Sequence, residues 1–241
     1  MDGKKNMKKL FLICTHGDEL NGLILRWKYG KEGGNYKIII ANLKALNKHK
    51  RFIDEDLNRV FNLPYKDNHE RNLAKKLTKI IKEHKIVYDI HQVEGKMKPC
   101  VFINKITKEI LEELRYINIK YVILDDNPQY SNHFTTSVAD IGITLEYPKR
   151  FKYLIQLLKD FKNIIENKEV TVKKEFFRNF AGIKDDYSIK YKNFVPLTIE
   201  QKQKLSRYVK IDINKEYCPI FVDVYQGYKC FLLEKINNIG F

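Results

Sequence analysis

Two histidines and two glutamates in this sequence stand where the chain could bring them to one place. His16 comes directly after the apolar run LFLICT, His91 after IVYDI, and Glu146 after IGITL. Glu19 lies three residues beyond His16. In an open parallel sheet, ligands bind outside the carboxyl ends of the strands. If the three runs are neighbouring strands, these four side chains lie together at one edge of the sheet.

Two histidines and one glutamate form a known ligand set of catalytic zinc sites, which leave a fourth position open for water. Such a site lowers the pKa of water to about 7 and polarises carbonyl groups. We therefore predict one zinc ion per chain, bound by His16, Glu19 and His91, although other divalent ions fit the same ligands. Taken singly, the first two residues also fit a polar turn, and the third a buried histidine. A structural zinc site is disfavoured because no C-x-x-C pair occurs among the four cysteines, Cys14, Cys100, Cys218 and Cys230.

Two further groups could support this site. Asp89 stands two residues before His91, so both side chains point to one face of a strand and the carboxylate can orient the histidine. The segment RFIDEDLNR contains a dense polar set, namely Arg51, Asp54, Asp56, Asn58 and Arg59. Charge runs are usually solvated loops. Arginine nevertheless offers a carboxylate a planar fork, which lysine does not. We predict Asp89 and Asp56 as residues that support the metal ligands from outside.

The elements that would position these residues alternate along the first two thirds of the chain. Apolar runs predict strands at 9–15, 36–42, 85–92, 99–104, 119–126 and 141–148. Amphipathic stretches predict helices at 18–30, 68–84, 107–117 and 151–168, with Glu19 in the first turn of the first helix. Long loops are expected at 43–67 and 125–140. This alternation indicates an α/β fold with a mostly parallel, mixed sheet covered by helices.

The character of the chain changes at residue 169. Strand-like runs occupy 169–183, 209–213 and 219–236, with one short helix candidate at 198–209. We therefore expect an α/β domain with the zinc site of a hydrolase over residues 1–168, and a small β-rich C-terminal part over 169–241 that packs near the active site.

Composition excludes some functions. Hydrophobic residues make up 44% and charged residues 31%, as in soluble globular proteins. No apolar run approaches the roughly 20 residues of a membrane helix, and LFLIC is too short for a signal peptide, so we expect a cytoplasmic protein without membrane contact. The net charge of +15 comes from lysines spread along the chain and interleaved with glutamate. This argues against nucleic acid as the main ligand and suits a small anionic substrate. Homo-oligomer formation is left open.

Four motifs, HGDELNG, RFIDEDLNRVF, YDIHQ and GITLEY in this order, resemble the succinylglutamate desuccinylase/aspartoacylase family of zinc carboxypeptidase-like hydrolases. The resemblance covers residues 8–150, and the motif around DLNRVF is its most specific part. It implies a zinc carboxypeptidase-like fold with His16, Glu19 and His91 as zinc ligands. It also implies roles for four other residues: Arg51 polarises the scissile carbonyl, Asn58 and Arg59 hold the substrate carboxylate, and Glu146 acts as general base and acid.

Two positions differ from the family pattern or match it weakly. Aspartoacylase has an arginine ten residues before the catalytic glutamate that binds the side-chain carboxylate of N-acetylaspartate; the matching residue here is Thr136. This difference counts against N-acetylaspartate as the substrate, unless His133 or a lysine replaces the arginine. The segment CPIFVDVYQGYKCF resembles the closing segment of the family, where a tyrosine contacts substrate, and Tyr228 is the candidate.

The expected function is that of a zinc-dependent amidohydrolase, a deacylase that cleaves the amide bond of a small anionic N-acyl amino acid. Two alternatives stay open. One is a zinc metallocarboxypeptidase that acts on small peptides, since the same zinc and arginine residues would serve it. The other is a basic protein that has a hydrolase-like scaffold but no enzymatic activity, and that binds RNA or another anion. This alternative would require an incomplete catalytic site.

Overall fold

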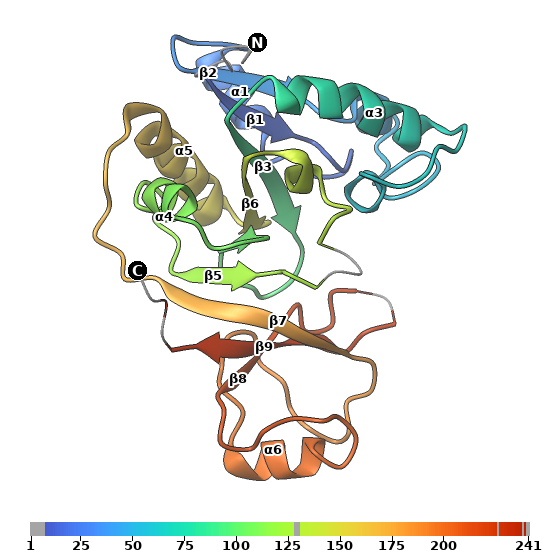
Figure 1. The fold of residues 1–241 in the computed structure, drawn as a ribbon, viewed down its shortest axis with the longest axis vertical. Coiled ribbons are helices and arrows are strands. Elements are labelled where there is room, and N and C mark those ends of the chain that lie inside the picture. The colour runs from blue at the N-terminus through green and yellow to red at the C-terminus, as the bar shows by residue number, and fades with distance from the viewer. Residues whose placement is uncertain (1–7, 128–130, 226, 238, 240–241) are drawn as a thin grey trace.

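One mixed β-sheet with helices on both faces makes up the core of the protein (Figure 1). The computed structural model describes residues 8–127, 131–225, 227–237 and 239. Within this part of the chain, the sheet has nine strands in the order β2-β1-β3-β6-β4-β5-β7-β9-β8. Their bounds are β1 (Lys9–Ile13), β2 (Tyr36–Ile40), β3 (Ile86–Val93), β4 (Cys100–Ile103), β5 (Tyr121–Leu124), β6 (Ile141–Pro148), β7 (Glu175–Ile183), β8 (Tyr217–Ile220) and β9 (Cys230–Ile236). The predicted α/β class with a mixed sheet is confirmed.

The strands that carry the candidate ligands are direct neighbours. β1 pairs with β2 and β3, and β3 pairs with β6, all in parallel. β4 runs antiparallel to β6, while β5 and β7 continue parallel to β4. β9 is antiparallel to β7, and β8 is antiparallel to β9. The carboxyl ends of β1, β3 and β6 therefore meet at one edge, as the prediction from the strand ends required.

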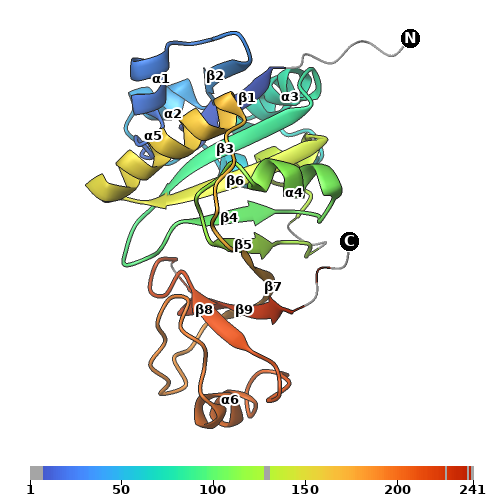
Figure 2. The same cartoon turned by 90° about the vertical axis from the view of Figure 1, so that its left-hand side faces the viewer.

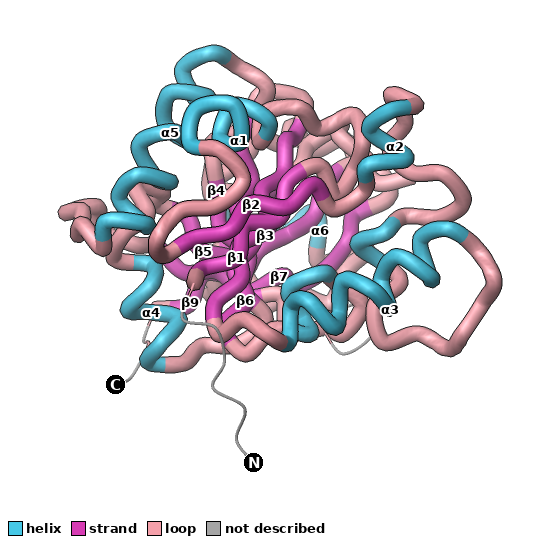
Figure 3. Tube along the Cα trace, turned by 90° about the horizontal axis from the view of Figure 1, so that it is seen from above, coloured by secondary structure: helices cyan, strands magenta, loops and turns pink. Residues whose placement is uncertain are grey.

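Alternate residues of β1 face two different helical layers, because side chains alternate along a strand. Leu10 and Leu12 belong to a buried cluster with residues of α3, whereas Phe11 and Ile13 pack in a cluster with residues of α1, α4 and α5. Figure 3 shows α3 on one side of the strands and α4 and α5 on the other. The helices are α1 (Leu23–Tyr29), α2 (Leu43–Asn47), α3 (His69–Lys82), α4 (Lys108–Leu114), α5 (Phe151–Glu166) and α6 (Ile199–Leu205).

The C-terminal strands extend the same sheet. β7 pairs with β5, so the sheet continues into β9 and β8, and α6 lies beyond them (Figure 2). The strand expected at 209–213 is absent, and that prediction was wrong. The carbonyl of Ile213 accepts a hydrogen bond from the Lys202 ammonium and not from a neighbouring strand. The division of the chain at residues 168 and 169 stays a prediction; it falls between α5 and β7.

Both segments that were expected as long loops contain short helices. α2 and the 3-10 helix η1 (Leu57–Arg59) lie within 43–67, and the 3-10 helix η2 (Thr135–Val138) lies within 125–140. None of the helices in the described residues is both long enough and apolar enough to cross a membrane.

Candidate active site and metal centre

The chain turns sharply after β1, and this turn presents His16 and Glu19. Cys14 adopts a left-handed backbone with φ of 53°. A Cβ atom on Gly17 would lie 2.2 Å from the backbone carbon of Ala45, so only glycine fits beneath α2. The Gly17 amide donates a hydrogen bond to the carbonyl of Arg51 at 3.1 Å. The turn is thus locked between α2 and the loop that carries Arg51.

Glu19 lies in this turn and not in a helix, so the expected helix start at residue 18 was wrong. α1 begins only at Leu23. The Glu19 amide donates to the His16 carbonyl at 3.2 Å, which closes a turn. The backbone amide of Gln92 in β3 donates to Oε2 of Glu19 at 3.0 Å. This contact between distant segments holds the carboxylate in place, and no local helix signal could predict it.

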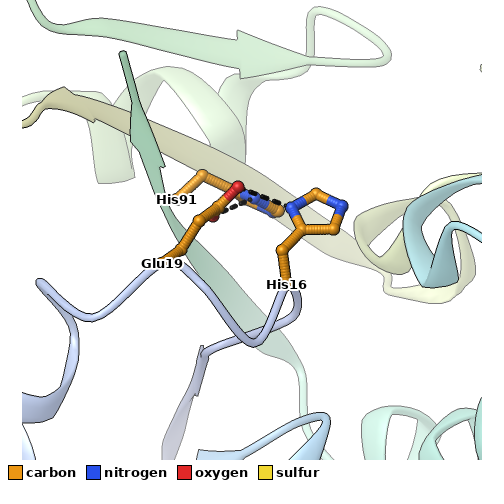
Figure 4. Close-up of side chains that lie close together, drawn as sticks. All are labelled: His16, Glu19 and His91. Carbon is orange, nitrogen blue, oxygen red and sulfur yellow. Dashed lines mark hydrogen bonds and ion pairs between the residues drawn. The ribbon is translucent and has the colours of Figure 1, made fainter. Parts of the chain in front are cut away.

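The side chains of His16, Glu19 and His91 converge on one buried point (Figure 4). Nδ1 of His16 lies 2.6 Å from Oε1 of Glu19, and Nδ1 of His91 lies 2.9 Å from Oε2. One ligand atom of each residue falls within 4.8 Å of the other two. All three residues are buried. The structure therefore brings together the three predicted metal ligands.

The second ring nitrogen of each histidine faces a carboxylate. Nε2 of His91 lies 2.9 Å from Oδ2 of Asp89, whose Oδ1 accepts a hydrogen bond from the Thr15 hydroxyl at 2.7 Å. Nε2 of His16 lies 2.9 Å from Oδ1 of Asp56. Metal-bound histidines in proteins typically donate their other N–H to a carboxylate, which fixes the tautomer. These residues therefore fit a divalent metal held by the two Nδ1 atoms and Glu19.

The electrostatics of this cluster favour a bound cation. Burial opposes ionisation of Glu19, but the charges of His91 and His16 outweigh it and hold the pKa of this carboxyl below its ordinary value. Burial also disfavours charge on His91, yet Asp89 and Glu19 raise the pKa of its ring well above the usual range. Two imidazoles thus sit among the carboxylates of Glu19, Asp89 and Asp56, an environment that stabilises positive charge.

Arg51 reaches the cluster from the loop before η1. Its Nη1 donates to Oε1 of Glu19 at 3.2 Å, and its Nη2 lies 3.2 Å from Nε2 of His16. Nη2 also lies 3.6 Å from Oδ2 of Asp56. The Arg51 side chain is 36% exposed, so it stands between the buried cluster and the solvent. In this position it can contact a group that approaches the cluster from outside.

A buried glutamate that the sequence analysis missed holds the Arg51 loop. Glu70, on α3, is fully buried and accepts hydrogen bonds from the backbone amides of Ile53, Asp54 and Glu55 at 2.8, 2.9 and 3.4 Å. It also accepts from the side-chain amide of Asn42 at 3.1 Å. In the sequence this residue looks like an acidic first-turn residue of a helix, and nothing distinguishes it from a solvent-exposed one.

Glu146 lies between the candidate metal cluster and a cavity. It pairs in register with His91 across β3 and β6, and its side chain lines the cavity. Burial raises the pKa of its carboxyl to about 7, and the negative charge of Glu19 adds to this effect against the opposing charges of His91, His16 and Arg51. A carboxyl with a pKa near neutrality can both accept and donate a proton at physiological pH.

The cavity has a volume of about 120 Å³, and Asn58 and Arg59 form part of its wall. Oδ1 of Asn58 accepts hydrogen bonds from the amide and hydroxyl of Thr135, at 2.8 and 2.9 Å, so Nδ2 is the donor that this side chain offers. The Arg59 guanidinium lies over the ring of Phe134, 5.1 Å from its centre. Among the described residues, the lining consists of Asn58, Arg59, Phe102, Asp125, Phe134, Thr144, Glu146, Asn179, Ile220, Phe221, Tyr225, Phe231 and Leu233.

Tyr228 is not among the described residues that line this cavity, and Tyr225 is. Tyr228 stacks on Phe231 with ring centres 5.0 Å apart, and it covers Gly182, where a Cβ atom would lie 2.5 Å from the tyrosine ring. Tyr225 stands three residues earlier, and burial raises the pKa of its hydroxyl. Of the two, Tyr225 is thus the tyrosine that the structure places at the cavity, and a substrate contact of Tyr228 stays a prediction. The repeated Tyr-x-x-Tyr spacing made the two indistinguishable in the sequence.

Thr136 and His133 are not among the described residues that line the cavity. The Thr136 hydroxyl is 3.2 Å from that of Thr144, and its backbone packs on Gly142, where a Cβ atom would come within 2.2 Å of the Thr136 carbonyl. Nδ1 of His133 donates to the carbonyl of Phe61 at 2.9 Å. Neither residue supplies a cation to the cavity.

Comparison with known proteins places these features in a family. Residues 6–169 match the model of the succinylglutamate desuccinylase/aspartoacylase catalytic domain. The chain is 27% identical over 163 residues to the aspartoacylase of Danio rerio, a match that covers 55% of this chain and 50% of that protein. It spans half or less of the length of the curated relatives it matches.

Solved structures show the same fold. The succinylglutamate desuccinylase of Chromobacterium violaceum superposes with a TM-score of 0.71 at 17% identity, over 98% of this chain and 87% of that one. Murine aminoacylase 3 superposes with a TM-score of 0.69 at 15% identity, over 98% and 97% of the two chains. The resemblance carried by the four motifs is confirmed: the chain belongs to the succinylglutamate desuccinylase/aspartoacylase catalytic-domain family.

Proposed function

We propose that this protein is a zinc-dependent deacylase that hydrolyses the amide bond of an N-acyl amino acid. The observation that carries the proposal is the convergence of His16, Glu19 and His91 beside Glu146, whose side chain lines a small cavity. Membership of a deacylase family supports the same reaction class. The names of the relatives suggest the amide substrates but do not identify the one used here.

His16, Glu19 and His91 would hold the zinc ion, with Asp56 and Asp89 fixing the two rings from outside. When bound, zinc supplies Lewis-acid chemistry, acidifying water and polarising an amide carbonyl. The rigid hydrogen bonds around these ligands reduce the reorganisation that metal binding requires.

Glu146 would move the proton. Its carboxylate accepts a proton from the attacking water, and the resulting carboxyl donates it to the leaving amine. A pKa of about 7, raised mainly by burial, suits a group that must carry out both steps. The two products are then a carboxylic acid and a free amino acid.

Arg51 and the Asn58–Arg59 pair would place the substrate. Arg51 reaches outward from the cluster, and its charge would stabilise the oxyanion that develops on the scissile carbonyl. Arg59 and the Nδ2 group of Asn58 line the cavity and offer donors to the carboxylate of the substrate. By holding the carboxylate of the substrate, the Arg59 guanidinium would determine which amide bond of the substrate lies next to Glu146.

The walls of the cavity favour a small substrate over a peptide. Ile220, Phe221, Tyr225, Phe231 and Leu233 all come from the C-terminal part, and they close one side of a cavity of only about 120 Å³. This observation ranks the metallocarboxypeptidase below the deacylase.

The test combines metal analysis with turnover. Purified protein loaded with zinc should hold one ion per chain and release amino acids from a panel of N-acetyl and N-succinyl amino acids. Glu146→Gln should lower kcat at least about 100-fold with zinc content unchanged. Glu94→Gln is the matched control, because Glu94 is an exposed glutamate paired with Lys149. Full activity in Glu146→Gln would refute the assigned proton transfer, and absence of both zinc and turnover would refute the proposed function.

A further inference from the structure

The cavity begins at Glu146, beside the candidate metal cluster, and extends away from it across the strands of the sheet. From Glu146 on β6 it passes Thr144 on the same strand and Phe102, which is paired with Thr144 from β4. Its far end is formed by Asp125, directly after β5, by Asn179 on the neighbouring β7, and by Phe231 and Leu233 on β9. Two strand spacings separate β6 from β5, which is roughly 10 Å. The far end of the cavity is therefore a long side chain's length away from the reacting centre.

Asp125 is an unusual residue for this far end, because it is only 8% exposed. Its Oδ1 accepts a hydrogen bond from Nδ2 of Asn179 at 3.4 Å, which is long for such a bond. The backbone amide of Asn127 also donates to the carboxyl. An ionised carboxylate has about four acceptor sites, and burying it with few partners is costly. Consistent with this, burial raises the pKa of Asp125.

The charges of the cavity wall leave Asp125 as the group that a substrate side chain would meet. Among the lining residues that the structure describes, Arg59 is the single cation, and Asp125 and Glu146 are the anions. Arg59 is assigned to the substrate carboxylate, and Glu146 to proton transfer. The charge of Arg59 also acts on Asp125, so this single cation is shared between that carboxylate and the carboxylate of the substrate. Among the described lining residues, no second cation is present to meet a second anionic group on the substrate.

Much of the remaining wall is apolar and aromatic. Phe102 stands on β4, between the strands that lead to Glu146 and Asp125, and Phe221, Phe231 and Leu233 add further apolar wall. Phe102 and Phe221 stack with ring centres 5.8 Å apart. Methylene groups gain from contact with such walls, and an ammonium or guanidinium group is attracted to aromatic faces. The cavity thus combines apolar walls with a buried carboxylate at its far end.

We propose that the substrate is an N-acyl amino acid with a long side chain that ends in a cation, of the lysine or arginine kind, and that Asp125 pairs with that cation. The inference rests on the proposed deacylase function and names the substrate class of that same site. Asp125 and Asn179 would then determine specificity at the far end of the cavity, while Arg59 binds the α-carboxylate.

The experiment compares kcat/KM of the zinc-loaded protein for a matched set of Nα-acetyl amino acids. Nα-acetyl-lysine and Nα-acetyl-arginine test the cation, Nα-acetyl-norleucine is the neutral analogue of similar shape, and Nα-acetyl-glutamate is the anionic one. We expect kcat/KM for the lysine substrate to exceed that for norleucine by at least about tenfold, because the apolar analogue offers the buried carboxylate no cation. Glutamate should be the poorest substrate of the set.

Asp125→Asn should reduce the lysine-to-norleucine ratio to about one, and Asp125→Lys should make the glutamate substrate better than the lysine substrate. Asp126→Asn is the matched control, since this neighbouring carboxylate is 39% exposed and pairs with Arg178 at the surface; it should leave the wild-type ratio unchanged. The lysine-to-norleucine ratio of the wild-type protein tests the inference even if one of the variants fails to fold.

The outcomes separate the two proposals. Turnover of norleucine or glutamate substrates at rates equal to or above lysine and arginine would overturn this inference and leave the deacylase function standing. No turnover of any N-acyl amino acid by zinc-loaded protein would refute the proposed function itself. An unchanged lysine preference in Asp125→Asn would show that another group recognises the cation and would overturn the assignment of Asp125.

Discussion

Replacing Asp89 tests how far the metal centre depends on a residue that would never touch the metal. Asp89 is fully buried between His91 and Thr15, with contacts of 2.9 Å and 2.7 Å. Asp89→Asn keeps an oxygen that can accept from Nε2 of His91, but it removes the negative charge. Asp89→Ala removes both the acceptor and the charge. The pair of variants therefore separates orientation of the ring from electrostatic support.

The expected magnitudes follow from these contacts. Mutation of a carboxylate that hydrogen-bonds a metal-binding histidine typically lowers the metal affinity about 10–100-fold. We expect a loss of about tenfold in zinc affinity for Asp89→Asn, because the ring stays oriented, and about 100-fold for Asp89→Ala. In the alanine variant Nε2 of His91 also loses its buried acceptor, which costs about 1–3 kcal/mol of folding free energy.

Zinc affinity is measured by competition with a chromophoric chelator, and stability by urea unfolding of the metal-free protein. Asp160→Asn provides a control of equal burial, since Asp160 lies on α5 and its Oδ2 accepts from the Tyr147 hydroxyl at 2.8 Å. Its zinc affinity should equal that of the wild type. Wild-type affinity in Asp89→Ala would refute the reasoning that His91 binds metal in an orientation set by Asp89.

Three further predictions concern other parts of the molecule. Arg51→Lys should lower kcat/KM by at least about tenfold with zinc content unchanged, measured by steady-state kinetics, because lysine lacks the planar fork; an equal rate would contradict the role of Arg51. Glu70→Ala should destabilise the protein by roughly 3 kcal/mol in urea unfolding, since three backbone amides lose their acceptor. Burial raises the pKa of Asp160 from 3.8 to about 6, so the folded state binds a proton that the unfolded chain has released. Stability should therefore fall by up to roughly 3 kcal/mol as pH rises from 4 to 6, and Asp160→Asn should lack this slope.

The sequence by itself determined the fold class and predicted the three residues that converge in the candidate metal site. The period of the apolar residues distinguishes strands from helices, and β6 was predicted with its observed bounds at 141–148. His16, His91 and Glu146 could be placed at one sheet edge because parallel strands have their carboxyl ends together. The motifs then related these residues to a family, which the match over residues 6–169 confirms.

Local pattern failed where contacts between distant segments decide the structure. The helix expected from residue 18 begins at Leu23, because Gly17 fits under α2 and Gln92 holds Glu19 outside any helix. The alternation at 209–213 suggests a strand, yet no strand in the described part of the chain pairs with it. Strand propensity without a partner is insufficient, since the backbone hydrogen bonds must still be satisfied.

The tertiary structure alone decided what surrounds the reaction centre. Glu70 and Asp125 are ordinary acidic residues in the sequence, and only the packing of α3 and of β5 against β7 buries them. The choice between Tyr225 and Tyr228 likewise depends on which ring faces the cavity and which covers Gly182. Burial is a property of the assembled fold, because it depends on segments far apart in the chain, and it changes a carboxylate from a solvated charge into a specific partner.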